Sequence, residues 1–146
     1  MSRPVAAMRL HPATVRLQVP FHDCDPLGVV WHGHYYKYME LARTKILTAL
    51  DLDGAELLAT GHRFYVIESR CRYAAALRYR DEVRVEGWID EVDPRINVRF
   101  EIFNETLGRR AARGHTTLAT CDDRGTLLLS TPPVLLERLL GHARTD

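Results

Sequence analysis

Cysteine is scarce in this sequence, and the few that occur form no recognisable pattern. The 146 residues include three cysteines, Cys24, Cys71 and Cys121, which are far apart and form no Cys-x-x-Cys pair. An odd number of isolated cysteines is not typical of a disulfide framework or a zinc ribbon. Reduced thiols in a reducing compartment are the simplest interpretation, so we expect a cytoplasmic protein.

The sequence also lacks a long hydrophobic run and an excess of one charge. Its formal net charge is +1, and its Lys/Arg and Asp/Glu residues are interspersed, which does not indicate a nucleic-acid partner. No apolar run is long enough to span a bilayer, and residues 1–12 lack the apolar core of a signal peptide. We therefore expect no membrane partner. The length predicts one domain, residues 1–146, with residues 1–12 as a flexible lead.

The first two predicted elements are a strand and a long helix. Apolar and polar residues alternate over residues 13–19, as in a half-buried strand, and Pro20 closes this stretch. Over residues 33–50, apolar residues recur at helical spacing, which predicts an amphipathic helix. A short helical turn is expected at residues 54–59.

After Gly61 the pattern changes to continuous strand. Residues 65–73, 83–89, 96–102 and 113–121 predict four strands, joined by turns short enough for an antiparallel meander. In the first of these strands we expect five side chains on one face: Tyr65, Ile67, Ser69, Cys71 and Tyr73. A proline at 132 or 133 predicts a short helix over residues 132–142. One helix packed on an antiparallel sheet is an α+β arrangement.

Two consecutive segments resemble a known family. Residues 23–32 read DCDPLGVVWH, and residues 35–44 read YYKYMELART. Together they resemble the 4-hydroxybenzoyl-CoA thioesterase and YbgC-like branch of the hotdog superfamily. The resemblance implies a hotdog fold, in which a five-stranded antiparallel sheet wraps a long central helix. It also implies an acyl-CoA thioesterase.

The resemblance assigns roles to residues near the start of the helix. It implies that Asp25 is the catalytic carboxylate, which acts on the thioester carbonyl as nucleophile or general base. The backbone N–H of His32 would stabilise the oxyanion at the helix N-terminus, and the His32 side chain is a further catalytic candidate. We expect the substrate to contact Gly28, Val30, Trp31, Gly33 and Tyr35.

Spacing alone leaves other interpretations of these residues open. Asp25 could be a helix N-cap or a turn carboxylate, and Asp23 is expected to stabilise a turn. Glu40 is an alternative base, but a local ion pair with Arg43 is the simpler interpretation. The His, Cys and Asp residues of the loop fit no standard zinc spacing, so we expect no metal. Four arginines are candidates for binding coenzyme A phosphates: Arg70, Arg72, Arg78 and Arg80.

Two other functions compete with thioester hydrolysis. A hotdog hydratase or dehydratase would carry an Asp-x-Asn-x-x-His pattern, which is absent. A non-catalytic acyl-binding protein could use the same fold. The expected partners are an acyl-CoA or acyl carrier protein thioester and a second copy of the chain. No cofactor is expected apart from coenzyme A as part of the substrate. An open sheet edge predicts a homodimer, pairing further into a homotetramer. The family resemblance implies that each site lies between two subunits.

Overall fold

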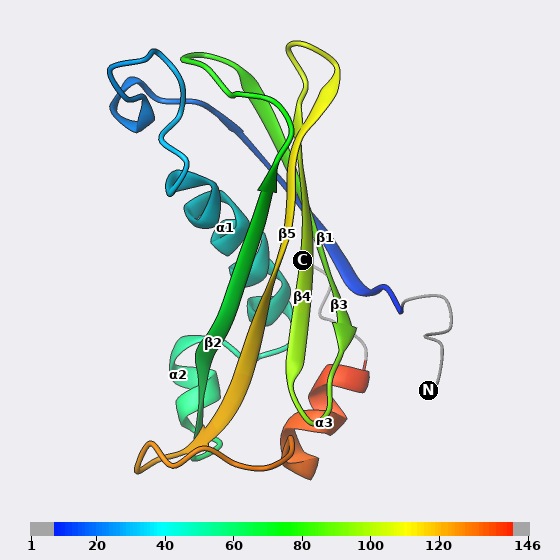
Figure 1. Ribbon diagram of the computed structural model, residues 1–146. Helices are drawn as coiled ribbons and strands as arrows, with labels where there is room; N and C mark the ends of the chain where they lie inside the picture. Colours follow the sequence, from blue (N-terminus) through cyan, green and yellow to red (C-terminus); the bar gives the residue numbers. More distant parts are fainter. Residues whose placement is uncertain (1–7, 142–146) are drawn as a thin grey trace, which may run out of the picture.

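One antiparallel sheet and three helices make up the described structure, a computed structural model that covers residues 8–141. The strands are β1 (Leu10–Gln18), β2 (His62–Tyr73), β3 (Glu82–Glu91), β4 (Ile96–Asn104) and β5 (Arg109–Asp122) (Figure 1). The helices are α1 (His34–Ala49), α2 (Gly54–Leu58) and α3 (Pro133–Leu140). A short 3-10 helix, Phe21–Asp23, follows β1.

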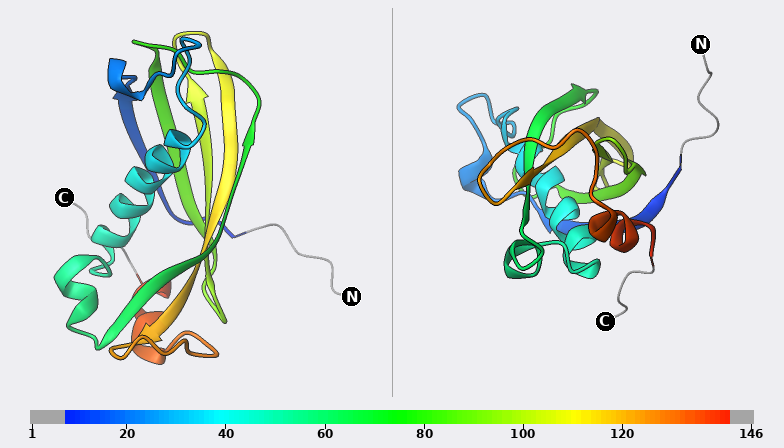
Figure 2. Two further views of the ribbon diagram at one scale, coloured as in Figure 1. Left: turned by 60° about the vertical axis from the view of Figure 1, so that its left-hand side comes forward. Right: turned by 90° about the horizontal axis from the view of Figure 1, so that it is seen from below.

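The strand order is β1-β3-β4-β5-β2, and every neighbouring pair is antiparallel. Helix α1 crosses one face of the curved sheet, and α2 and α3 lie at the end remote from the start of α1 (Figure 2). The predicted α+β hotdog fold, with a long central helix wrapped by a five-stranded antiparallel sheet, is therefore confirmed. Strand β2 lies at one edge of this sheet.

Small residues on the inner face of the sheet let α1 approach it closely. A Cβ atom on Gly87 would lie 3.2 Å from the Cβ atom of Ala42 on α1. A Cβ atom on Gly114 would lie 3.1 Å from the Met39 sulfur and 2.2 Å from the Arg70 carbonyl oxygen. Large buried side chains surround these contacts, and each contributes about 1.5–3 kcal/mol by its burial. Helix α1 is thereby held at a fixed position on the sheet.

A β-bulge in β2 changes which side chains share a face. Val66 pairs with Leu118 and Glu68 with Thr117, so Ile67 is the additional residue. A bulge interrupts the two-residue alternation of a strand. Tyr65 therefore faces away from the side occupied by Ser69, Cys71 and Tyr73. The expectation that the five side chains from Tyr65 to Tyr73 share one face is therefore wrong. The alternation of residues in the sequence does not reveal the extra residue of a bulge.

The terminal elements differ slightly from their expected bounds. Strand β1 begins at Leu10 rather than at residue 13, and most of the expected lead, residues 1–12, lies outside the described residues. Helix α3 covers Pro133–Leu140, and residue 142 of the expected helix also lies outside them. In the described part of the chain, no helix combines the length and apolar character needed to cross a membrane.

The close approach of β2 and β5 at Gly114 can be tested by substitution. Gly114→Ala is expected to lower the free energy of unfolding by about 1–3 kcal/mol, because the new methyl group would meet a backbone oxygen of β2. Urea-induced unfolding followed by circular dichroism measures the difference. An unfolding midpoint equal to that of the wild type would contradict this packing.

Candidate active site

Asp25 lies in a small hairpin between β1 and α1. Its backbone N–H donates to the Val29 carbonyl at 2.8 Å, and Cys24 bridges to Val30. The Trp31 N–H closes the base of the hairpin on the Asp23 carbonyl at 3.0 Å. Such a tight reversal needs a left-handed residue, and Gly28 supplies it with a φ of 82°. The sequence DCDPLGVVW therefore folds locally into a compact loop that ends at the start of α1.

The Asp25 carboxylate is held by one oxygen and free at the other. Its Oδ1 accepts the backbone N–H groups of Leu27 at 2.9 Å and Val29 at 3.4 Å. Its Oδ2 accepts no hydrogen bond from the residues that the structure describes. The N-cap position of α1 is Gly33, so the helix-cap interpretation of Asp25 is wrong. The turn interpretation holds for one oxygen, and the second oxygen is available to act as a nucleophile or base.

Asp23 is a buried anchor between this loop and α1. Its side chain is 1% exposed, and it accepts hydrogen bonds from Lys37 Nζ at 2.6 Å and Tyr38 OH at 2.7 Å. Burial alone would raise the pKa of the Asp23 carboxyl, but the hydrogen bonds from Lys37 and Tyr38 hold it below its ordinary value. Asp23 therefore fixes the loop to the first turns of α1. The sequence predicted that Asp23 stabilises a turn and did not predict its contacts with α1. The presence of Lys37 on the predicted helix could have suggested an ion pair.

The start of α1 presents unused backbone donors. The N–H groups of His34, Tyr35 and Tyr36 donate to carbonyls three residues earlier. Within residues 8–141, the N–H groups of His32 and Gly33 have no acceptor. A side chain at Gly33 would collide with the Trp31 ring, since a Cβ atom there would lie 2.2 Å from it. The ring therefore packs directly over the backbone that carries these donors.

Tyr73, at the end of β2, holds the same backbone from the opposite side. Its hydroxyl donates to the His32 carbonyl at 2.7 Å. Because that carbonyl and the Gly33 N–H belong to one planar trans peptide, they point in opposite directions, and Tyr73 fixes the orientation of the N–H. Burial, with a contribution from Cys71, raises the pKa of Tyr73, so its hydroxyl remains a donor. The sequence placed Tyr73 on a strand face and gave no signal of this contact.

The other predicted site residues divide into exposed and buried groups. Trp31 and His32 are exposed, and the His32 ring lies 6.3 Å from that of Tyr73, centroid to centroid. Val30 and Tyr35 are buried, and both bind Leu77: the Val30 N–H donates to its carbonyl at 2.8 Å, and the Tyr35 hydroxyl accepts its N–H at 3.2 Å. Substrate contact by Trp31, Val30 and Tyr35, and likewise by Gly28 and Gly33, remains a prediction.

Two further expectations concern charged residues near the site. Arg43 lies 3.6 Å from Glu40 on α1, the local ion pair that the spacing predicts. In the described part of the chain, no three His, Cys, Asp or Glu side chains are grouped so that they could hold a metal ion.

The sheet wrapped around α1 and the loop at its N-terminus define a protein of the hotdog class. A model of the thioesterase-like superfamily matches residues 19–139, so the chain belongs to that family. The resemblance predicted from residues 23–44 is thereby confirmed.

Individual relatives agree with this assignment. The chain is 30% identical to a candidate esterase from Synechocystis sp., covering 86% of this chain and 77% of the relative. It is 31% identical to the acyl-CoA thioesterase YbgC of Haemophilus influenzae, covering 52% and 57%. The solved structure of a gentisyl-coenzyme A thioesterase is 25% identical, with a TM-score of 0.70 and coverage of 88% and 100%.

The role of Asp23 as an anchor predicts a pH-dependent effect of its removal. A carboxyl whose folded-state pKa lies below the ordinary value of 3.8 stabilises the fold above that pH, and this contribution is lost as the pH falls through the lowered pKa. Asp23→Asn is therefore expected to cost about 1.5–3 kcal/mol of unfolding free energy near neutral pH. The difference from the wild type should shrink in acid.

Urea unfolding at several pH values measures this difference, with Asp123→Asn as the matched control because Asp123 is exposed. A difference between wild type and Asp23→Asn that stays constant with pH would refute the anchor role of the charge.

Proposed function

We propose that this protein hydrolyses acyl-CoA thioesters at the junction of the hairpin and α1. The observation that carries the proposal is the combination of a free Asp25 Oδ2 with two unused backbone N–H groups at His32 and Gly33. A thioester carbonyl needs an attacking oxygen on its carbon and donors for the negative charge that develops on its oxygen. One short segment supplies both requirements.

The reaction follows from these groups. Asp25 either attacks the carbonyl carbon directly or takes a proton from an attacking water. The carbonyl oxygen becomes negatively charged and accepts hydrogen bonds from the backbone at the start of α1, where the helix dipole also favours negative charge. The C–S bond then breaks, and the thiolate of coenzyme A leaves and gains a proton. After direct attack the acyl group is left as a mixed anhydride with Asp25, which water hydrolyses to the carboxylic acid. After attack by water the carboxylic acid forms directly as the thiolate leaves. No cofactor beyond the coenzyme A of the substrate takes part.

The residues around this junction are proposed to position the acyl thioester. Trp31 is 49% exposed and packs over Gly33, so its ring offers an apolar wall beside the donors. The exposed His32 side chain can assist proton transfer to the leaving thiol. Gly28 leaves the tip of the hairpin unobstructed. The buried residues Val30 and Tyr35 are also proposed to contact the substrate.

Coenzyme A is the proposed carrier of the acyl group, with acyl carrier protein as the alternative. Two of the similar proteins are named as coenzyme A thioesterases, one for acyl-CoA and one for gentisyl-CoA. We further propose that the protein acts in the cytoplasm, where its three free cysteines would remain reduced.

A homodimer is proposed to form through β2. Among the strands of residues 8–141, this edge strand pairs with β5 alone, and its residues Tyr65, Val66 and Ile67 are each nearly half exposed. An open edge with apolar side chains favours pairing with a second copy, which would extend the sheet. Because Tyr73 ends β2 and holds the start of α1, such pairing would place each site beside the subunit boundary. Two dimers would then form the tetramer.

Replacement of the proposed catalytic carboxylate tests the function. Asp25→Asn is expected to lower the rate of thiol release from acyl-CoA by about 100- to 10,000-fold, because the amide can neither attack nor accept a proton. A panel of aromatic, short and long acyl-CoA substrates with a thiol-reactive dye gives the rates. Asp123→Asn is the control. Unchanged activity of Asp25→Asn, or no activity of the wild type with any acyl group, would reject the proposal.

The contact between Tyr73 and His32 predicts a smaller effect. Tyr73→Phe removes the hydroxyl that orients the peptide between His32 and Gly33, so kcat is expected to fall about threefold to tenfold. KM should change little, because the ring remains in place. Steady-state kinetics separates the two constants. A change in KM alone would show that Tyr73 contacts the substrate and does not position the backbone donor.

A further inference from the structure

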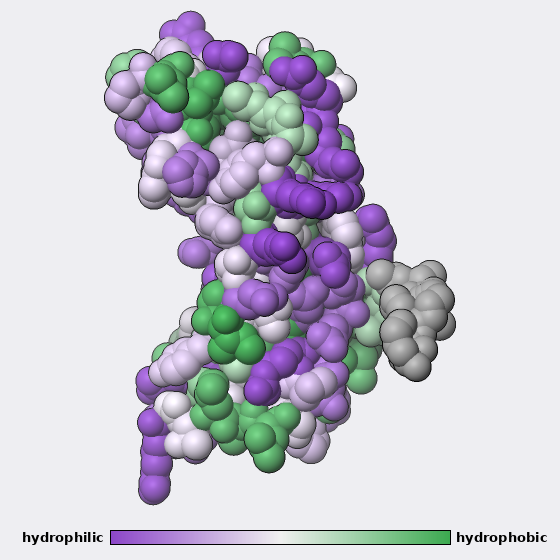
Figure 3. Space-filling view, in the orientation of Figure 1, coloured by the Kyte–Doolittle hydropathy of each residue, from purple (hydrophilic) through white to green (hydrophobic). Residues whose placement is uncertain are grey.

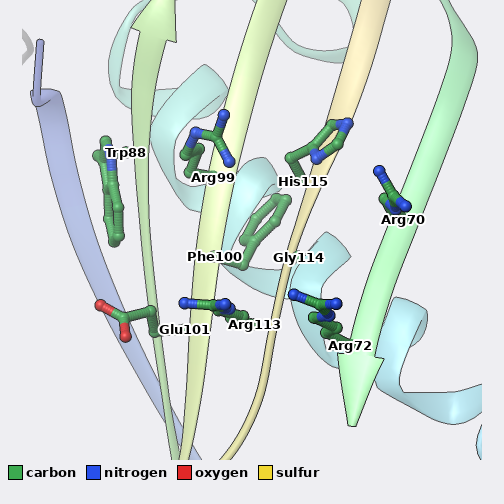
Figure 4. Close-up of a pocket in the computed structure, with 9 residues that line it drawn as sticks. All are labelled: Arg70, Arg72, Trp88, Arg99, Phe100, Glu101, Arg113, Gly114 and His115. Atoms are coloured by element: carbon green, nitrogen blue, oxygen red, sulfur yellow. The ribbon is translucent and has the colours of Figure 1, made fainter. Parts of the chain in front are cut away.

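The face of the sheet opposite α1 carries a pocket of about 520 Å³ that is lined with cationic side chains. Figure 4 views this face with α1 behind the sheet. Hydrophilic side chains cover the middle of it (Figure 3). We call this site the arginine pocket and define it by Arg70, Arg72, Arg99, Arg113 and His115. These residues come from β2, β4 and β5, so the pocket is remote in sequence from the hairpin that holds Asp25.

Strand register places like charges directly against one another in the arginine pocket. Arg113 on β5 is the direct partner of Arg72 on β2, and on its other side it faces Glu101 on β4. In the neighbouring row of the same face, His115 lies between Arg99 on β4 and Arg70 on β2. Like charges directly opposite in a sheet are destabilising. An arrangement that costs stability locally indicates a binding function.

Carboxylates do not neutralise the core of this pocket. Within residues 8–141, no carboxylate forms an ion pair with Arg70, Arg72 or Arg113. The pocket also contains Glu101, but this carboxylate already binds Arg110 at 2.9 Å and lies 4.0 Å from Arg9.

The other basic residues near this core, Arg99 and His115, have carboxylate partners. The Asp90 carboxylate binds Arg99 at 2.6 Å, and His115 lies 2.8 Å from Glu68. Elsewhere on the same face, Arg16 and Arg84 also pair with a carboxylate. Arg70, Arg72 and Arg113 thus differ from the directly opposed pair Arg16 and Arg84, which shares the Glu105 carboxylate.

We propose that the arginine pocket binds an organic anion that carries a diphosphate group. Guanidinium groups are planar forks that match the oxygen atoms of phosphate and bind them bidentately. The unpaired arginines occupy two rows of the sheet, and successive positions on one strand face are roughly 7 Å apart. Side chains from both rows can therefore engage two linked phosphates better than one. The proposal does not depend on thioester hydrolysis.

The same charges argue against a second protein sheet on this face. Face-to-face packing of two copies would remove the unpaired arginines from water without supplying carboxylates, and desolvating uncompensated charge is costly. A small anion neutralises the arginines while leaving the face hydrated.

Calorimetric titration with inorganic pyrophosphate tests the proposal. Wild-type protein is expected to bind pyrophosphate, and the double variant Arg70→Gln/Arg113→Gln should raise Kd at least tenfold. Arg63→Gln is the matched control, because Arg63 is an exposed arginine of β2 outside the pocket. No binding to the wild type, or equal Kd for wild type and double variant, would overturn the proposal.

A single variant keeps the proposal testable if the double variant does not fold. Arg113→Gln alone removes the charge opposed to Arg72, so the protein without ligand should unfold at an equal or higher temperature while losing affinity for pyrophosphate. A lower unfolding temperature combined with unchanged pyrophosphate affinity would overturn the proposal.

Kinetics with acyl-CoA distinguishes two sources of the diphosphate. A raised KM in the double variant, parallel to the loss of pyrophosphate binding, identifies the diphosphate of coenzyme A as the anion. An unchanged KM together with that loss identifies a separate diphosphate ligand, for which adenosine diphosphate is the first probe. Failure of thioester hydrolysis in the wild type would leave the pyrophosphate titration unaffected, so the two proposals fail separately.

Discussion

The buried Asp23 carboxylate, bound to Lys37 and Tyr38, is the contact on which the geometry of the site depends. Its backbone carbonyl also accepts the Trp31 N–H, so one residue fixes both the base of the hairpin and its position on α1. Without this link, Asp25 would occupy a loop that could move relative to the helix N-terminus. A catalytic carboxylate and an oxyanion donor must keep a fixed separation to act on one carbonyl group. The two aspartates of the loop therefore differ in role: Asp23 holds the geometry, and Asp25 is the residue that we propose reacts.

The backbone donors are held from two sides in the same way. Trp31 packs over Gly33, and Tyr73 binds the carbonyl of the adjoining peptide. Tyr73 belongs to the edge strand that we propose pairs with a second copy, so the start of α1 is connected to the proposed dimer interface through one hydrogen bond. On the opposite face of the sheet, register alone brings Arg72 against Arg113. The pairing of β2 with β5 therefore positions Tyr73 on one face of the sheet and the opposed arginines on the other.

Periodicity in the sequence was sufficient for the elements and for the α+β class, because the alternation of β1 and the helical spacing of α1 are local properties. The DCDPLGVVWH segment located the loop and identified Asp25 as a candidate. Features that depend on strand pairing could not be predicted in this way. The bulge at Ile67 reverses the face of Tyr65, and Arg72 and Arg113 meet only once β2 and β5 are aligned. The contacts of Asp23 and Tyr73 likewise join residues that are distant in sequence.

A crystal structure of the Asp25→Asn variant with a bound acyl-CoA would test the proposed site directly. We expect the thioester carbonyl oxygen to lie within about 3 Å of a backbone N–H of His32 or Gly33. We expect the carbonyl carbon to lie about 3–3.5 Å from the side chain at position 25, or one water molecule away from it. A thioester bound away from the start of α1, with these N–H groups unused, would show that the hairpin and the helix N-terminus are not the active site.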